Sequence, residues 1–181
     1  MNIFLTDFNP YKSSKHLDDL RLNKMILETA QLLCTAYRSI YNDNPEILYK
    51  DTHINHPCSI WARKSKNNFF YLHIYWQALN QERSYRFPDK KPHLSYIKLN
   101  NIFLNKINIE KTKYKLIKKR SVYINFDFNC TEYKDYEITI AYKLQLIKKW
   151  TNDIKTPKWT NREKPYFFEG KEIIYSMLNL F

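Results

Sequence analysis

The stretch from Leu17 to Tyr37, LDDLRLNKMILETAQLLCTAY, constrains the fold most. At 3.6 residues per turn, its apolar side chains cover well over half of a helix. A surface helix usually carries an apolar band of about 100° and a broad polar remainder. Because the proportions are reversed here, we predict a central helix that packs on most of its sides. The residues expected to be buried are Leu22, Met25, Ile26, Ala30, Leu32, Leu33, Ala36 and Tyr37.

A narrow polar stripe completes the circumference of this helix. Its members are Arg21, Lys24, Glu28, Gln31, Thr35 and Arg38. On a mostly buried helix, such groups would share one cleft or face. Lys24 and Glu28 lie one turn apart, so each can stabilise the charged form of the other. A solvated helix edge with an ordinary ion pair would give the same pattern.

The chain of 181 residues contains a single glycine, Gly170. Phosphate-binding glycine loops and the dinucleotide-binding fingerprint are therefore excluded. Hairpin-rich β folds are disfavoured too, although asparagine can serve in some turns. The apolar fraction of 44% suffices for a substantial core, and the length suits one domain. We predict a mainly α protein, a single compact helical domain over residues 1–181 around a buried N-terminal helix, with at most a small strand element.

Local patterns predict the remaining elements. Further helices are expected over residues 65–87, 93–104 and 136–150, and from Pro57 onward. Residues 2–6 would form an edge strand or an extended arm, and Ser13 or Ser14 would cap the first helix. Residues 121–128 alternate like a strand. Most aromatic side chains of 65–87 are expected in the core; exposed ones beside Arg63 would instead form a stacking surface for bases.

Cysteine and histidine spacing predicts no metal centre and no cofactor. Cys34, Cys58 and Cys130 have neither the density of a disulfide framework nor zinc-ligand spacing, so all three are expected to be reduced. His53 and His56 are three residues apart without an obvious third ligand. These histidines are expected to cap a helix or bind anions. The chain also lacks a run of 18 apolar residues and a signal-peptide core, so no membrane partner is expected.

Positive charge is concentrated in the middle of the chain. The formal net charge is +12. Residues 61–120 hold 15 basic and 3 acidic side chains, whereas residues 1–60 hold 6 and 7. This distribution favours a polyanionic partner, with nucleic acid as the usual one; a generally lysine-rich protein without such a partner is the alternative. The residues expected to contact nucleic acid or phosphate are Lys24, Gln31, His56, Arg63, Lys64, Asn67, Lys118, Arg120 and Arg162.

Two blocks carry a resemblance. The first runs from Asp19 through Glu28 to Leu33, and the second is Asn55-His-Pro-Cys-Ser-Ile-Trp61 with Arg63 and Asn67 behind it. Together with residues 159–168, they resemble a group of uncharacterised phage and giant-virus proteins. That resemblance implies an intracellular protein, in the host cytoplasm or nucleus.

A second likeness concerns activity. Asp19, Arg21, Leu22 and Glu28 are similar to the start of pyrimidine-dimer DNA glycosylases of the endonuclease V type. In those small, basic, all-α enzymes the N-terminal amine attacks the sugar, a helix glutamate stabilises the cationic intermediate, and β-elimination cuts the strand. The resemblance implies DNA rather than RNA as partner, with Glu28, Arg21 and the amine of Met1 as catalytic groups. The chain departs from the pattern in carrying Leu27 at a position where those enzymes have a basic residue.

The chemistry of such a site is reasonable in general terms. An α-amine has a reference pKa of about 7.7–8.0, so a useful fraction is neutral at pH 7. A carboxylate can stabilise the positive charge that develops on the sugar. Two alternatives remain: a non-catalytic viral nucleic-acid-binding protein, and a nucleotide-processing enzyme. In the latter, basic side chains such as Lys24 and Arg63 would grip a phosphate and Glu28 would act as base.

Overall fold

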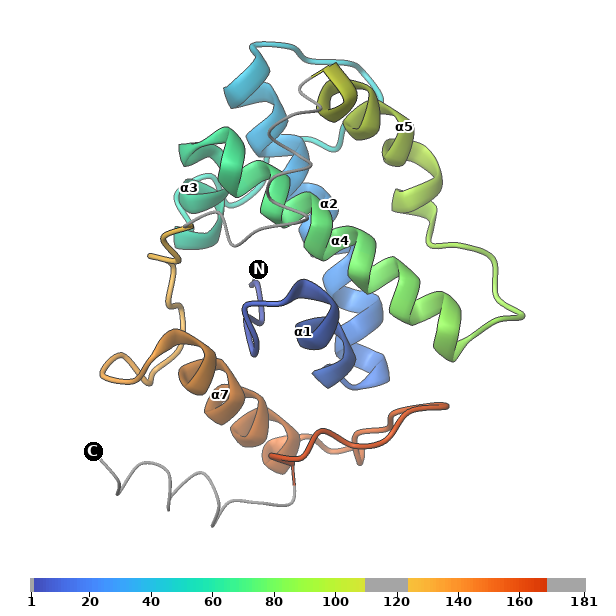
Figure 1. Ribbon diagram of the computed structural model, residues 1–181, viewed down its shortest axis with the longest axis vertical. Coiled ribbons are helices and arrows are strands. Elements are labelled where there is room, and N and C mark those ends of the chain that lie inside the picture. The colour runs from blue at the N-terminus through green and yellow to red at the C-terminus, as the bar shows by residue number, and fades with distance from the viewer. Residues whose placement is uncertain (1, 110–123, 169–181) are drawn as a thin grey trace.

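Helices make up the regular structure of the residues that the computed structural model describes, 2–109 and 124–168. They are α1 (Pro10–His16), α2 (Asp19–Tyr41), α3 (Pro57–Lys64), α4 (Lys66–Arg86), α5 (Leu94–Ile109) and α7 (Ile138–Asn152) (Figure 1). The described ranges contain no strand, and the prediction of a mainly α fold is confirmed.

Helix α2 begins after Asp18, whose side chain accepts a hydrogen bond from the backbone N–H of Arg21 at 3.4 Å. It ends at Asn42, which adopts the left-handed conformation with φ 48°. All eight apolar residues predicted to be buried are buried. The predicted cap was wrong: Ser13 and Ser14 lie inside the separate helix α1, where both are buried, and the chain is extended again at residues 17–18 before α2 begins.

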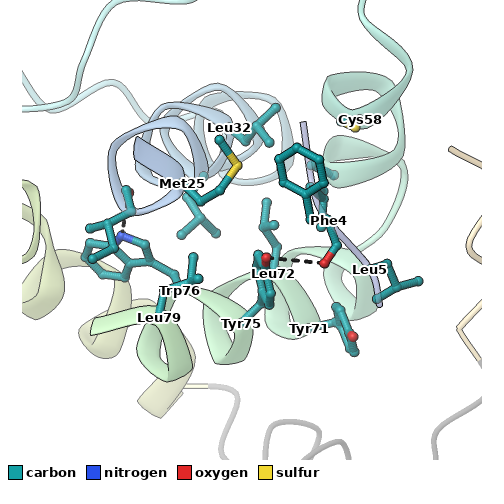
Figure 2. Close-up of a cluster of buried hydrophobic side chains, with 14 of the residues drawn as sticks. Phe4, Leu5, Met25, Leu32, Cys58, Tyr71, Leu72, Tyr75, Trp76 and Leu79 are labelled. Atoms are coloured by element: carbon teal, nitrogen blue, oxygen red, sulfur yellow. Dashed lines mark hydrogen bonds between the residues drawn. The ribbon is translucent and has the colours of Figure 1, made fainter. Parts of the chain in front are cut away.

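Helix α4 crosses α2 in the centre of the molecule (Figure 1). Apolar side chains surround nearly its whole circumference, as in a helix buried by its neighbours. Trp76 donates its indole N–H to the carbonyl of Ile26 at 3.0 Å, and the hydroxyl of Tyr75 points to the carbonyl of Phe4 (Figure 2). The aromatic residues of α4 are mostly core, as predicted; Tyr85 is the exception, with 55% of its surface exposed.

The N-terminal residues form an extended arm rather than a strand. Ile3, Phe4 and Leu5 are at most 4% exposed. The arm lies between the crossed helices and α7 (Figure 1), where the ring of Phe4 meets that of Tyr142 edge to face at 6.1 Å. Met25 and Leu72 pack close to the same arm (Figure 2). The first residues of the described chain are therefore part of the core.

The segment expected as a strand has alternating burial but no strand partner. Phe126 and Phe128 face Trp61, with ring centroids 5.8 and 4.6 Å away, while Asn125 and Asp127 are exposed. The carbonyl of Asn125 accepts a hydrogen bond from the indole of Trp61 at 2.8 Å. Residues 121–123 lie outside the described ranges. Over 124–128 the alternation thus reflects packing against one tryptophan rather than sheet formation.

Helix α7 and the segment after it close the molecule. The spacing of apolar residues predicts that Ile138, Ala141, Tyr142, Leu144 and Ile147 form the buried side of α7. All are buried except Ile138, which is partly buried. The returning chain stacks Phe167 on Trp150 at 5.9 Å. One hydrophobic cluster therefore contains residues from both ends of the described chain. No helix in that part of the chain has the length and apolar character needed to cross a bilayer.

Candidate functional site

A polar cavity of about 350 Å³ is lined by residues of α2, of the N-terminal arm and of the end of α7. Its described lining residues are Asn2, Phe4, Leu20, Arg21, Lys24, Met25, Glu28, Lys149 and Asp153. Three of these belong to the polar stripe predicted on α2. The stripe therefore opens onto a cavity, and two carboxylates and three basic side chains meet there.

Glu28 is the carboxylate that the N-terminal arm reaches. Its side chain is only 15% exposed, and its Oε2 accepts a hydrogen bond from the backbone N–H of Asn2 at 3.0 Å. Its Oε1 lies 3.7 Å from Nζ of Lys24, one turn earlier on α2. The side chain of Lys24 is 68% exposed, so this ion pair joins a sheltered carboxylate to an ammonium group in solvent. The predicted pairing on one helix face is present.

Arg21 lies at the same cavity but is held by two carboxylates. Its Nη1 is 3.0 Å from Oδ1 of Asp18 and 2.8 Å from Oδ2 of Asp153, and its Nη2 donates to Asp153 Oδ1 at 3.0 Å. Asp18 also accepts the indole N–H of Trp150 at 2.8 Å. This network joins the start of α2 to the end of α7. The resemblance assigns the Arg21 guanidinium to catalysis, but in the structure it bridges Asp18 and Asp153 and so connects two helices.

A second group of reactive side chains lies on the other side of Asn2. His56, Cys58 and Cys130 place one ligand atom each within 4.8 Å of one another. The two sulfur atoms are 3.6 Å apart, and Cys58 Sγ is 3.9 Å from Oδ1 of Asn2. Cys58 is fully buried, whereas Cys130 is partly exposed. Asn2 therefore contacts both Glu28 and the thiol pair.

Helix α3 sets the geometry of this group. As predicted, His56 caps the helix and Pro57 opens it: Nδ1 of His56 accepts the backbone N–H of Cys58 at 3.2 Å. Burial lowers the pKa of His56. The hydrogen bond between the thiols lowers the pKa of Cys130 to about 7 and, with burial, raises the pKa of Cys58. The hydrogen bond from one thiol thus favours the loss of a proton from the other.

The other predicted phosphate-contacting residues within the described ranges do not line the cavity. At the end of α3, Arg63 donates to the carbonyl of Ile54, and Lys64 pairs with Asp127. Arg162 is bound by both carboxylate oxygens of Glu82 at 2.9 Å. Gln31 and Asn67 are both partly exposed. Lys118 and Arg120 lie outside the described residues, as does Met1, the predicted catalytic amine.

Three polar residues of the cavity were not predicted as site residues: Asn2, Lys149 and Asp153. Lys149 and Asp153 belong to the end of α7, more than 120 residues away from Glu28 along the chain, and no local pattern connects them. Cys130 was missed as a neighbour of Cys58 for the same reason, since 72 residues separate the two. Only chain folding brings these groups together.

Comparison with protein-family models, with curated proteins and with solved structures gave no match. The function is therefore inferred from the cavity and its side chains.

Proposed function

We propose that this chain processes nucleic acid, acting as a DNA glycosylase/AP-lyase-like enzyme on damaged or modified bases at the cavity around Glu28. One observation carries the proposal: the backbone nitrogen of Asn2 donates to the sheltered Glu28 carboxylate at 3.0 Å. Asn2 thus lies against the acidic side chain that the glycosylase resemblance assigns to catalysis.

The chemistry follows from covalent geometry. In a chain that starts at Met1, the α-amine is three bonds from the Asn2 nitrogen, which limits their separation to about 4 Å. The neutral amine would attack the sugar C1′ with its lone pair, and the base would leave with the electrons of the glycosidic bond and take up a proton. Loss of the amine proton and ring opening give an iminium ion, whose positive charge the carboxylate of Glu28 stabilises. Abstraction of a C2′ proton then expels the 3′ phosphate.

The surroundings of Glu28 suit a nucleic-acid substrate. A volume of about 350 Å³ lies within the usual range of small-molecule pockets. Extruding a nucleotide from a duplex costs a few kcal/mol, least for a damaged base. Lys24 and Lys149 line the cavity, and their contacts with phosphates would offset this cost.

Borohydride trapping on an oligonucleotide with an abasic site tests the proposal. The full-length protein should form a covalent adduct, and acetylation of the N-terminus should abolish it. Glu28→Gln should reduce strand cleavage at least about 100-fold, by analogy with the loss of a single electrostatic stabiliser elsewhere. Glu46→Gln, a matched change at an exposed carboxylate outside the cavity, should leave cleavage unchanged.

A second candidate, nucleic-acid binding without chemistry, is favoured by one observation. Arg21 is engaged by Asp18 and Asp153 and does not extend into the cavity as a free cation. Under this alternative, the protein binds duplex DNA with strong salt dependence but forms no adduct and cuts no strand. Tight binding of a mononucleotide, with little preference for duplex, would instead indicate a nucleotide-processing enzyme.

A further inference from the structure

The distance between the sulfur atoms of Cys58 and Cys130 can be compared with that in a disulfide and that in a metal site. A disulfide bond holds its sulfurs about 2.05 Å apart. Two thiolates on one tetrahedral zinc ion, with Zn–S bonds of about 2.3 Å, lie about 3.8 Å apart. The observed separation is 3.6 Å. The two sulfur atoms are thus not bonded to each other, and their separation is close to that of two thiolates on one metal ion.

A third ligand stands beside the sulfurs. A ring nitrogen of His56 lies within 4.8 Å of both ligand atoms, and soft thiolates together with imidazole form a donor set that selects zinc. From these positions we propose that His56, Cys58 and Cys130 bind one thiophilic divalent cation, Zn²⁺ in the cell. Three protein ligands leave a fourth coordination position, for water or for the nearby amide oxygen of Asn2.

The fold holds the ligands in place before a metal arrives. Cys58 is on the first turn of α3 and fully buried. The backbone N–H of Cys130 donates to the hydroxyl of Tyr142 at 3.3 Å, and that hydroxyl also donates to the carbonyl of Phe128 at 3.3 Å. These bonds tie the Cys130 loop to α7. Such outer contacts orient metal ligands in known sites.

His56 is the adjustable ligand. Its Nδ1 accepts the Cys58 N–H at 3.2 Å, so coordination through Nδ1 exchanges this hydrogen bond for a metal–ligand bond. We therefore expect both thiolates to be essential and the imidazole to increase affinity.

The proposed ion would be a neighbour of the cavity around Glu28. Asn2 contacts both places, through its N–H on one side and its side-chain amide on the other. Metal binding by the three side chains is nevertheless independent of glycosylase chemistry. A negative trapping experiment and a positive metal titration would be compatible with each other.

Cobalt(II) is the probe for the test, because thiolate ligation gives an intense sulfur-to-cobalt charge-transfer band. The chelator-treated full-length protein, kept reduced, is titrated with Co²⁺ and then with Zn²⁺. We expect one equivalent of Co²⁺ with this band, and its displacement by Zn²⁺. Absence of the band in the wild-type protein overturns the proposal, whatever the variants do.

Variants locate the ligands. Cys58→Ser and Cys130→Ser should each lose the charge-transfer band. Cys34→Ala should keep it, because this variant removes a buried thiol of α2 that is not part of the proposed site. His56→Asn retains a helix-capping side chain but removes the imidazole. It should weaken Zn²⁺ binding at least 10-fold at unchanged helix content. Unchanged affinity in His56→Asn, or a band that depends on Cys34, contradicts the assignment.

Discussion

At the scale of single residues, burial sets the protonation behaviour of this protein. His73 on α4 is fully buried between aromatic neighbours, with ring centroids 6.1 Å from Trp76 and 6.2 Å from Phe103. Burial lowers its pKa from 6.5 to about 3. His16, packed edge to face on Phe167, has its pKa lowered to about 4, chiefly by burial. Both side chains are therefore neutral in the folded protein at pH 5 and protonated in the unfolded chain.

This difference predicts acid sensitivity. Below pH 6.5 His16 and His73 are protonated in the unfolded state but stay neutral in the folded state. The free energy of unfolding therefore falls as pH falls towards the folded pKa values. Each histidine contributes a slope of up to about 1.4 kcal/mol per pH unit. The free energy of unfolding of His73→Phe, minus that of the wild type, should therefore rise as pH falls from 6.5 to 4, by about 1.4 kcal/mol per pH unit. Urea unfolding at pH 7.5 and 4.5 measures it, and a difference independent of pH would contradict the prediction.

At the scale of elements, helix ends are built without glycine. Asn42, after the last residue of α2, adopts the left-handed conformation, as do His53 and Asn161 in loops. Asparagine tolerates this region better than most residues because its short polar side chain can hydrogen-bond locally. The chain therefore ends its central helix with asparagine at the position where glycine is usual.

Substitution at this helix end tests the role of Asn42. Asn42→Ala should reduce the free energy of unfolding by about 1 kcal/mol, because alanine is strained in the left-handed region. Asn42→Gly should retain at least the wild-type value. Ser39→Ala, on the exposed side of the same helix, is the matched control and should change stability by less than about 0.5 kcal/mol. Equal stabilities of the alanine and glycine variants at position 42 would refute this explanation.

At the scale of the whole molecule, buried ion pairs join distant segments. Arg21 connects α2 to Asp153, 132 residues later, and the carboxylate of Glu82 binds both Arg86 of its own helix and Arg162 of the returning chain. Arg86 is completely buried. Removing one member of a buried ion pair leaves the other charge in a poorly hydrated position. The resulting loss of stability exceeds the net stabilisation that the intact pair provides.

Arg21→Met should therefore destabilise the protein by about 3–5 kcal/mol, since Asp18 and Asp153 would lose their shared cation. Chemical denaturation monitored by circular dichroism measures this loss. Lys98→Met, at an exposed position of α5, is the control and should change little. A loss below about 1 kcal/mol for Arg21→Met would show that the ion pairs of Arg21 with Asp18 and Asp153 contribute little to stability. The guanidinium would then be a candidate for ligand binding in the cavity.

Local patterns in the amino-acid sequence were enough to predict the main helices and the residues that they bury. Helical periodicity and N-capping are interactions between residues at most four positions apart, so α2, α3 and α7 could be predicted with their core residues. The pairing of Lys24 with Glu28 has the same local origin. Two expectations failed: a serine cap for the first long helix, and a strand over residues 121–128, of which 124–128 are described and form none. Both concern positions where several local structures fit one pattern.

Contacts between distant residues follow from the packing of the folded chain. Packing places Asn2 against Glu28, Asp153 against Arg21 and Cys130 against Cys58, over separations of 26, 132 and 72 residues. Such contacts depend on how whole helices pack and on which loops close, and no repeat in the sequence encodes them. The amino-acid order therefore fixed which side chains were available for chemistry, whereas the packing of the N-terminal arm, α2, α3 and α7 selected the ones that meet.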